Sequence, residues 1–401
     1  MKQEHKDVNK ILPYGELLRG FANQSYLVKS DLKRFLRNRG VFLNTSDKEK
    51  LVPCISTLIL SPKEFDDLRE YQNTKEDNFK KNSSRLNWNS TATVTDAIKH
   101  IDLTNVLPKD GINYYLTKEP SISLNKDEKN IVKIEFEIER NDLNKSFYES
   151  TNRFTGEIEI RKISESEIKI TKSYTSSESN AVADSLIKIA ENHFKAQQIV
   201  KPEQELRKIL FGDFTNEDRI VFFYRLSSNM ENSHFKFKDI VDMDFKPDNS
   251  ESLPAEIEWM SNKSELKLRG KQIHDTFFIK ESKYNKNLQF WEMESSYDFK
   301  YALFEGSCNL VFSFKNFQSK GNLAEFEINI SNFNLNNSSD FSNKEKLTIK
   351  NKLLLLFENQ KDVVYSKFLT YLESKNAVAS TPIVPTSAKA SSETGNGTDA
   401  A

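Results

Sequence analysis

The residues whose chemistry most clearly indicates a partner lie between positions 29 and 50. Seven basic residues stand against three acidic ones in this stretch, which gives it a net charge of +4 in a chain whose total is −1. The rest of the chain therefore sums to −5. A compact basic surface beside helix N-termini suits contacts to phosphate groups. The predicted nucleic-acid-binding residues are Lys29, Lys33, Arg34, Arg37, Arg39, Lys48 and Lys50.

Two short helices, with an extended loop between them, must position these basic residues. Ser30 and Asp31 can both cap the first helix, and Gly40 suits the left-handed position that closes it. Ser46 is the cap candidate for the second helix, in which Pro53 must lie in the first turn or cause a kink. The apolar positions have helical spacing in both segments. They are Leu32, Phe35 and Leu36 in the first helix and Leu51, Val52, Ile55 and Leu58 in the second.

This stretch resembles the SAP-type helix–extended loop–helix DNA-binding module. The matching residues are Asp31-Leu32-Lys33, Leu36, Arg39-Gly40-Val41, Lys48 and Leu51-Val52. The family has glycine where this chain has Ser46, and the loop here is one residue longer. The resemblance implies binding of duplex DNA with weak sequence preference, with phosphate contacts from Lys33, Arg37, Arg39 and Lys48. The alternative is a helical hairpin whose charged face is simply solvated.

Length and composition place limits on the rest of the chain. A length of 401 residues, with 37% hydrophobic and 29% charged, predicts two or three globular domains. No apolar run approaches a membrane span, and the polar N-terminus has no secretory signal. Cys54 and Cys308 are too few for a disulfide framework or a metal cluster. We therefore expect a cytoplasmic protein with no membrane partner, and the abundance of Asn, Lys and Ile suggests a bacterial source.

From about residue 115 the pattern changes to antiparallel strands and helices. Ile131 to Glu139 alternates strictly between apolar and charged residues, which predicts a half-buried strand. Gly156 to Ile163 and Glu167 to Tyr174 alternate in the same way and predict a hairpin. Helices are predicted from Ala181 to about Gln198 and within 203–231. The later strands are predicted at Thr276 to Lys280, Leu288 to Glu294, Cys308 to Phe314 and Leu323 to Ile330, before a long helix from Lys344 to Ser374.

The sequence thus predicts an α+β fold: a small N-terminal all-α module followed by an antiparallel α+β body. Residues 72–90, rich in Asn, Lys and Ser, are interpreted as a linker, and 235–260 as irregular or weakly stranded. The predicted domains are a basic SAP-like module at 1–70, a linker with a short helix at 71–114, α+β units at 115–232 and 233–376, and a disordered tail at 377–401.

The order of elements in the body repeats. Phe154-Thr155-Gly156 and Phe304-Glu305-Gly306 each precede a hairpin, a loop rich in Ser and Asn, and a helix. One hypothesis is that the body holds two diverged copies of one unit, at about 115–200 and 265–375. The other is that the shared order is coincidence. Unrelated strand orders in the two halves would contradict the duplication.

Catalytic motifs are scarce. The five histidines have no metal-type spacing, and neither a glycine-rich phosphate loop nor a nucleophile elbow is present. We therefore predict no cofactor, no metal and no catalytic residue. Asp248 followed by Glu265-Leu266-Lys267 has the form of a PD-(D/E)xK-like nuclease site, in which carboxylates hold Mg²⁺. In a chain so rich in Glu and Lys, however, Glu-x-Lys also arises by chance.

The leading hypothesis is a non-catalytic bacterial DNA-binding protein. Its body would dock a protein partner, a subunit of a DNA-processing or antiviral defence system. The first alternative is a Mg²⁺-dependent nuclease that uses Asp248, Glu265 and Lys267. The second is a structural interaction protein with no nucleic-acid role.

Overall fold

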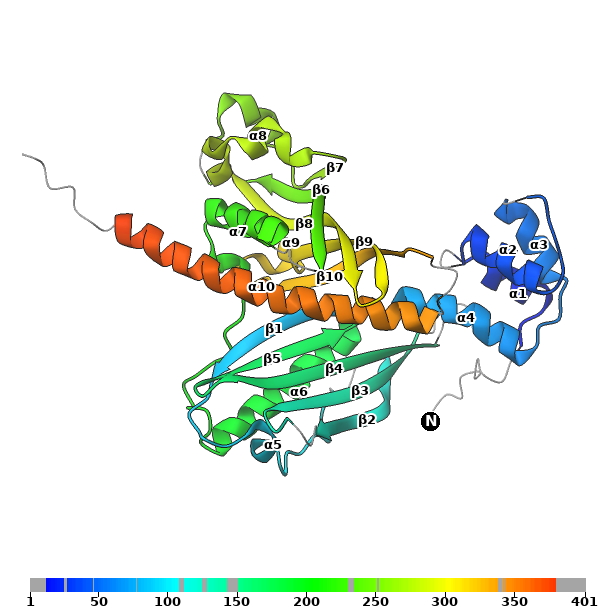
Figure 1. Ribbon diagram of the computed structural model, residues 1–401, viewed down its shortest axis with the longest axis horizontal. Coiled ribbons are helices and arrows are strands. Elements are labelled where there is room, and N and C mark those ends of the chain that lie inside the picture. Colours follow the sequence, from blue (N-terminus) through cyan, green and yellow to red (C-terminus); the bar gives the residue numbers. More distant parts are fainter. Residues whose placement is uncertain are drawn as a thin grey trace, which may run out of the picture.

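The computed structural model shows a helical N-terminal module and a body built on one antiparallel sheet (Figure 1). It describes residues 12–24, 27–45, 47–76, 78–107, 112–124, 128–142, 151–229, 234–250, 252–337, 341 and 343–379. The helices are α1 (Gly15–Ala22), α2 (Lys29–Asn38), α3 (Lys48–Ser56), α4 (Pro62–Glu76), α5 (Val94–Ala97), α6 (Ser177–Ala196), α7 (Asn216–Asn229), α8 (Phe277–Lys280), α9 (Phe317–Lys320) and α10 (Asn343–Ala379). The predicted α+β class is confirmed.

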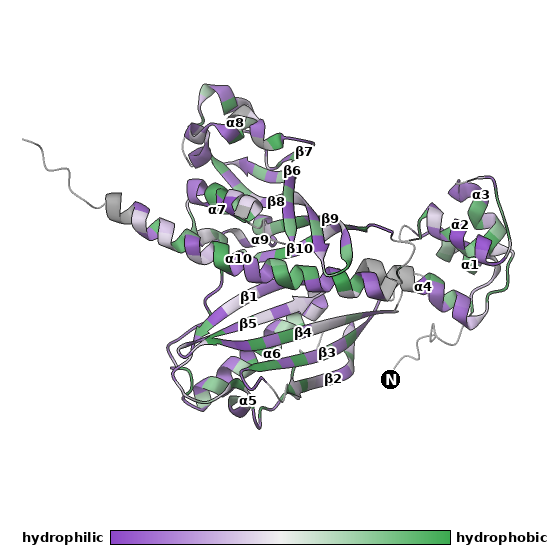
Figure 2. Cartoon of the chain, viewed as in Figure 1, coloured by the Kyte–Doolittle hydropathy of each residue, from purple (hydrophilic) through white to green (hydrophobic). Residues whose placement is uncertain are grey.

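Ten strands form the sheet in the order β2-β3-β4-β5-β1-β10-β9-β8-β6-β7. Their bounds are β1 (Lys80–Asn87), β2 (Tyr114–Leu124), β3 (Ile131–Asn141), β4 (Thr151–Ser164), β5 (Glu167–Tyr174), β6 (Phe235–Pro247), β7 (Leu266–Arg269), β8 (Leu288–Tyr301), β9 (Phe304–Phe314) and β10 (Phe326–Leu335). Figure 2 shows hydrophobic and hydrophilic residues alternating along β3 and β4. This is the pattern of sheets with one buried face.

Strand β1 lies at the centre of the sheet and joins its two halves. It pairs with β5 along its whole length and with β10 through Lys80 and Lys81. The interpretation of residues 72–90 as a linker is therefore wrong, because the structure has the end of α4 and all of β1 in this range. The strand was missed because Leu86 is its only large apolar residue.

The two halves of the sheet bury opposite faces. In the first half, α6 packs on β4 and β5, and Leu86 is level with Ile168 on that face. In the second half, α7 and α10 cover the other face, where Lys81 is level with Ile328. Each half therefore has one face covered by helices and a second face that carries mainly polar side chains.

The strand orders of the two halves correspond. In the first half, β2, β3, β4 and β5 follow one another across the sheet toward β1, and α6 is the next helix in the chain. In the second half, β6, β8, β9 and β10 follow one another toward β1 from the other side, and α10 is the next helix in the chain. Gly156 on β4 lies opposite Phe136 on β3, and Gly306 on β9 lies opposite Phe299 on β8. These correspondences favour the duplication hypothesis, which stays a hypothesis.

Several element boundaries differ from the predictions. Residues 235–247, predicted to be irregular or weakly stranded, form the long strand β6, and Phe277–Lys280, predicted as a strand, forms α8. Helix α6 begins at Ser177 rather than Ala181, because Ser176 caps it and accepts a bond from the Ser179 backbone N–H. Of the predicted tail, residues 377–379 belong to α10, and 380–401 lie outside the described residues, as does Ser46. Among the helices described, none has the length and apolar character to cross a bilayer.

Candidate nucleic-acid interface

The N-terminal module has its own hydrophobic core. Helices α1 to α4 contribute residues with almost no exposed area, among them Leu18, Leu32, Leu51 and Phe65. The predicted apolar faces of α2 and α3 are therefore confirmed. The basic residues lie between these apolar positions in the sequence. Their side chains can extend into solvent or bond to other groups of the module.

The turns of the module follow the predicted chemistry with two differences. Gly40 has φ +76°, the left-handed conformation expected of it. Asp47 caps α3, and its carboxylate accepts a bond from the Glu49 backbone N–H at 3.3 Å. Pro53 lies in the second turn of α3 rather than the first. At the start of α4, Ser61 and Glu64 form a capping box.

Arg39 connects the end of α2 to the start of α4. Its Nε and Nη2 donate to the two carboxylate oxygens of Glu64 at 2.6 and 2.5 Å. Nη2 also donates to the Ile59 carbonyl at 2.7 Å. The hydrogen bonds from Arg39 lower the pKa of Glu64 to about 2. A guanidinium held in this way stabilises the module.

Lys48 closes the end of α1. Its Nζ donates to the carbonyl oxygens of Asn23, Gln24 and Leu27 at 2.9, 2.7 and 2.9 Å. These three bonds use every donor of the ammonium group. The lysine that the SAP resemblance marks as a phosphate contact therefore has a structural role here.

Four of the other five basic residues are exposed. On α2, Lys29, Arg34 and Arg37 are exposed and Lys33 is partly buried, while Lys50 is exposed on α3. Arg34 Nη2 lies 3.3 Å from Asp31 Oδ1. Ion pairs of this kind at the surface contribute little to the stability of the fold. A hollow of about 360 Å³ follows the outer side of α2 and is lined by Ser30, Asp31, Arg34, Arg37 and Asn38.

The comparison with known families agrees with the extent of this module. Residues 16–78 match the family model of the GAPS4b protein N-terminal domain. The matched span begins inside α1 and ends between α4 and β1, so it covers the helical module and stops before the sheet. No curated protein matches the chain. The SAP resemblance stays a prediction.

The predicted nuclease residues each have a hydrogen-bond partner of their own. Asp248, Glu265 and Lys267 each bond to a different residue. Their partners are Asn216 for Asp248 at 2.7 Å, Gln318 for Glu265 at 2.9 Å and Asp244 for Lys267 at 2.8 Å. Within the described part of the chain, no group of three or more His, Cys, Asp or Glu side chains is placed to hold a metal ion. The geometry therefore gives the nuclease alternative no support.

A row of carboxylates on β6 and β8 was missed in the sequence. Asp242 lies opposite Glu294 and Asp244 opposite Glu292, and Lys267 Nζ reaches Asp244 Oδ2 at 2.8 Å. The sequence patterns Asp-x-Asp and Glu-x-Glu could have revealed this row. In a strand, residues two apart lie on the same face of the sheet. Burial, reinforced by the neighbouring carboxylates, raises the pKa of Glu292 to about 7.

Replacing Glu292 by glutamine should stabilise the fold above pH 7 and have little effect at pH 5. The pKa of Glu292 is about 7 in the folded state against an ordinary 4.5. The stability from this group therefore falls as the pH rises from 4.5 to 7 and stays low above it. Glutamine resembles the protonated acid, so the gain at pH 8 should be on the order of 2 kcal/mol. Chemical unfolding at both pH values measures it, and equal gains at pH 5 and 8 would contradict the argument.

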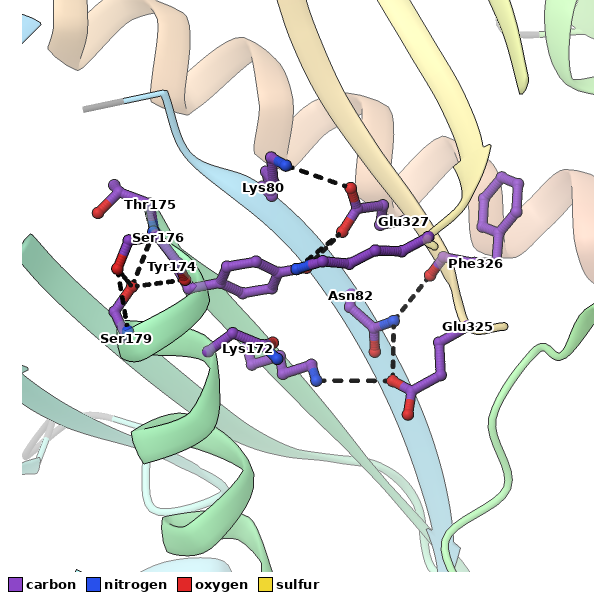
Figure 3. A network of polar contacts seen from close by, with 12 residues as sticks. Lys80, Asn82, Lys172, Tyr174, Thr175, Ser176, Ser179, Glu325, Phe326 and Glu327 are labelled. Atoms are coloured by element: carbon purple, nitrogen blue, oxygen red, sulfur yellow. Dashed lines mark hydrogen bonds and ion pairs between the residues drawn. The ribbon is translucent and has the colours of Figure 1, made fainter. Parts of the chain in front are cut away.

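A buried polar network joins β5, β1 and β10 at the centre of the sheet (Figure 3). The Tyr174 hydroxyl donates to Glu327 and accepts from Lys315 Nζ, the latter at 3.1 Å. Lys80 Nζ lies 3.6 Å from Glu327. Burial, followed by the charge of Glu327, raises the pKa of Tyr174, so the phenol stays protonated. The group therefore holds strands together and is a poor candidate for proton transfer.

The same network continues along β1 on the face that carries α6. Asn82 Nδ2 donates to the Phe326 carbonyl at 2.8 Å, and Lys172 Nζ lies 3.5 Å from Glu325. Lys208 Nζ donates to Glu325 at 2.6 Å. The polar side chains that made β1 look like a linker are thus the ones that connect the two halves of the body.

Proposed function

We propose that the chain is a non-catalytic DNA-binding protein whose N-terminal module contacts phosphates through α2 and α3. The observation that supports this is the exposed placement of Lys29, Arg34, Arg37 and Lys50, with Lys33 partly buried on the same helix as the first three, on a module that closes its own core. Arg39 and Lys48 keep the two helices in place and so act indirectly. Contacts of this kind read the backbone, which favours duplex DNA with weak sequence preference.

The decisive experiment is a salt series of DNA binding by the full chain. The variant Lys29→Ala/Arg37→Ala/Lys50→Ala removes three exposed charges without touching the Arg39 and Lys48 bonds. Each phosphate contact contributes close to one unit to the slope of log K against log salt. We therefore expect the slope to fall by about 2–3 units and the affinity near 0.1 M salt by about 100-fold.

The matched control removes three exposed lysines from the body. The variant Lys236→Ala/Lys263→Ala/Lys271→Ala makes the same change in net charge. It should bind DNA as the wild type does. If both triple variants bind equally, or if the wild type does not bind, DNA binding through the module is wrong. The chain would then be a structural interaction protein whose charged helices are only solvated.

The second part of the proposal is that the body docks a separate subunit of a DNA-processing or defence system. It rests on the attachment of a basic module to a body in which the described residues assemble no cluster that could hold a metal ion. The alternative would be shown by DNA cleavage in Mg²⁺ that disappears in Asp248→Ala. We expect no such cleavage by the purified chain.

A further inference from the structure

A groove of about 460 Å³ lies between α10 and the uncovered face of the first half of the sheet. Helix α10 crosses the middle of the sheet, and β5, β4 and β3 extend away from it (Figure 1). The strands contribute Thr155, Thr171 and Ser173 to the lining, and α10 contributes Asn351 and Lys352. We call this the α10 groove. Its volume is that of a small-molecule site.

Most of the acidic residues in the α10 groove already have basic partners. Three glutamates from β3 and β4 form ion pairs along the sheet surface. The pairs are Glu135 with Lys118 at 3.7 Å, Glu157 with Lys133 at 3.1 Å and Glu159 with Arg161 at 3.0 Å. The charges of these glutamates are therefore largely neutralised before any ligand arrives.

Lys81 is in a different situation. It is 8% exposed, and its Nζ donates to the Ser173 hydroxyl at 2.5 Å. Among the residues that the structure describes, no carboxylate lies within 4.0 Å of this ammonium group. An ammonium has three donors, and burying it with no carboxylate at ion-pair distance is costly, although the charges of Glu157, Glu358 and Glu159 offset part of that cost from further away. Burial accordingly lowers the pKa of Lys81. Lys352 lines the same groove and also forms no ion pair with a described residue.

We propose that the α10 groove binds a small phosphate ester of mononucleotide size. The phosphate lies between Lys81 and Lys352, and the hydroxyls of Thr171 and Ser173 donate to its oxygens. Charge-assisted bonds of this kind are the strong ones. Ser173 is the cross-strand partner of Lys81, so the hydroxyl and the ammonium group are already side by side. Phe79 and Leu355 supply apolar surface for the rest of the ligand.

Calorimetric titration of the full chain with AMP, inorganic phosphate and adenosine tests the proposal. AMP should bind saturably, phosphate should bind more weakly, and adenosine should bind at least tenfold more weakly than AMP. Lys81→Gln and Lys352→Ala should each weaken AMP binding at least tenfold. Lys352 is on a helix surface, so its variant keeps the test valid if Lys81→Gln does not fold. Lys367→Ala, an exposed position on α10, is the matched control and should bind as the wild type does.

Three outcomes would overturn the proposal. The first is no saturable binding of AMP or phosphate up to about 1 mM. The second is equal affinity for AMP and adenosine, since the phosphate would then contribute nothing. The third is unchanged AMP affinity in the folded Lys352→Ala variant. The α10 groove uses no residue of the N-terminal module, so its failure and the failure of DNA binding are separate results.

Discussion

Replacing Lys361 by methionine should lower the free energy of unfolding by about 3–5 kcal/mol. Lys361 is 2% exposed and Glu358 is fully buried between α10 and the centre of the sheet. Lys361 Nζ donates to Glu358 at 2.5 Å and to the Ser83 hydroxyl at 2.7 Å. Methionine would leave the Glu358 carboxylate buried beside Lys169 alone, which is 3.5 Å away. Denaturant unfolding of the full chain measures the loss.

Two further variants separate charge compensation from packing. Lys367→Met makes the same substitution at an exposed position of α10 and should change stability by less than about 0.5 kcal/mol. In Glu358→Leu/Lys361→Met the buried pair becomes apolar, so the double variant should recover much of the loss. A double variant that is as unstable as the sum of its single changes would contradict this account.

Gly156→Ala should destabilise the body by about 2–3 kcal/mol, and Phe136→Leu should restore most of that loss. A Cβ at position 156 would lie 2.1 Å from Cζ of Phe136. The three ring atoms that it meets are absent from leucine, so the shorter side chain removes the clash. Thermal and denaturant unfolding of the two single variants and the double variant measures these changes in stability as a double-mutant cycle.

Gly306 provides the contrasting case in the second half of the sheet. A Cβ there would lie 2.1 Å from the backbone oxygen of Asn334 and 2.9 Å from Cζ of Phe299. Gly306→Ala should therefore cost at least as much as Gly156→Ala. Phe299→Leu should not rescue it, because the closer atom belongs to the backbone. Rescue in both halves would show that side-chain crowding alone sets the requirement for glycine.

The sequence predicted the elements whose apolar residues alternate cleanly. Strands β3, β4 and β5 have a regular apolar face, and the hairpin of β4 and β5 was recognised from it. Strand β6 was predicted only as irregular or weakly stranded, and its pairing with β8 has register shifts at three points. Strand β1 was missed because charged and amide groups, Lys81 and Asn82 among them, are buried there by pairing with polar groups more than 90 residues away. Local patterns cannot report partners at that separation.

The candidate interface shows the same limit at the level of single residues. The sequence identifies a concentration of positive charge but not which charges are already used. Arg39 is held by Glu64, 25 residues later, and Lys48 is held by carbonyls 21–25 residues earlier. Both look like surface residues in a helical pattern. Only the structure of the module distinguishes these two residues, which have partners within it, from the exposed Lys29, Arg37 and Lys50.

The central position of β1 has a consequence for how the chain folds as it is made. Lys80 and Lys81 pair with β10, so the sheet is completed only after residues 326–335 have been synthesised. Until then the edge of β1 that will face β10 has no neighbour, and unpaired strand edges promote association between chains. The contacts of the N-terminal module, by contrast, are local and form early. The order of synthesis therefore allows the basic module to fold while the body is still an open sheet.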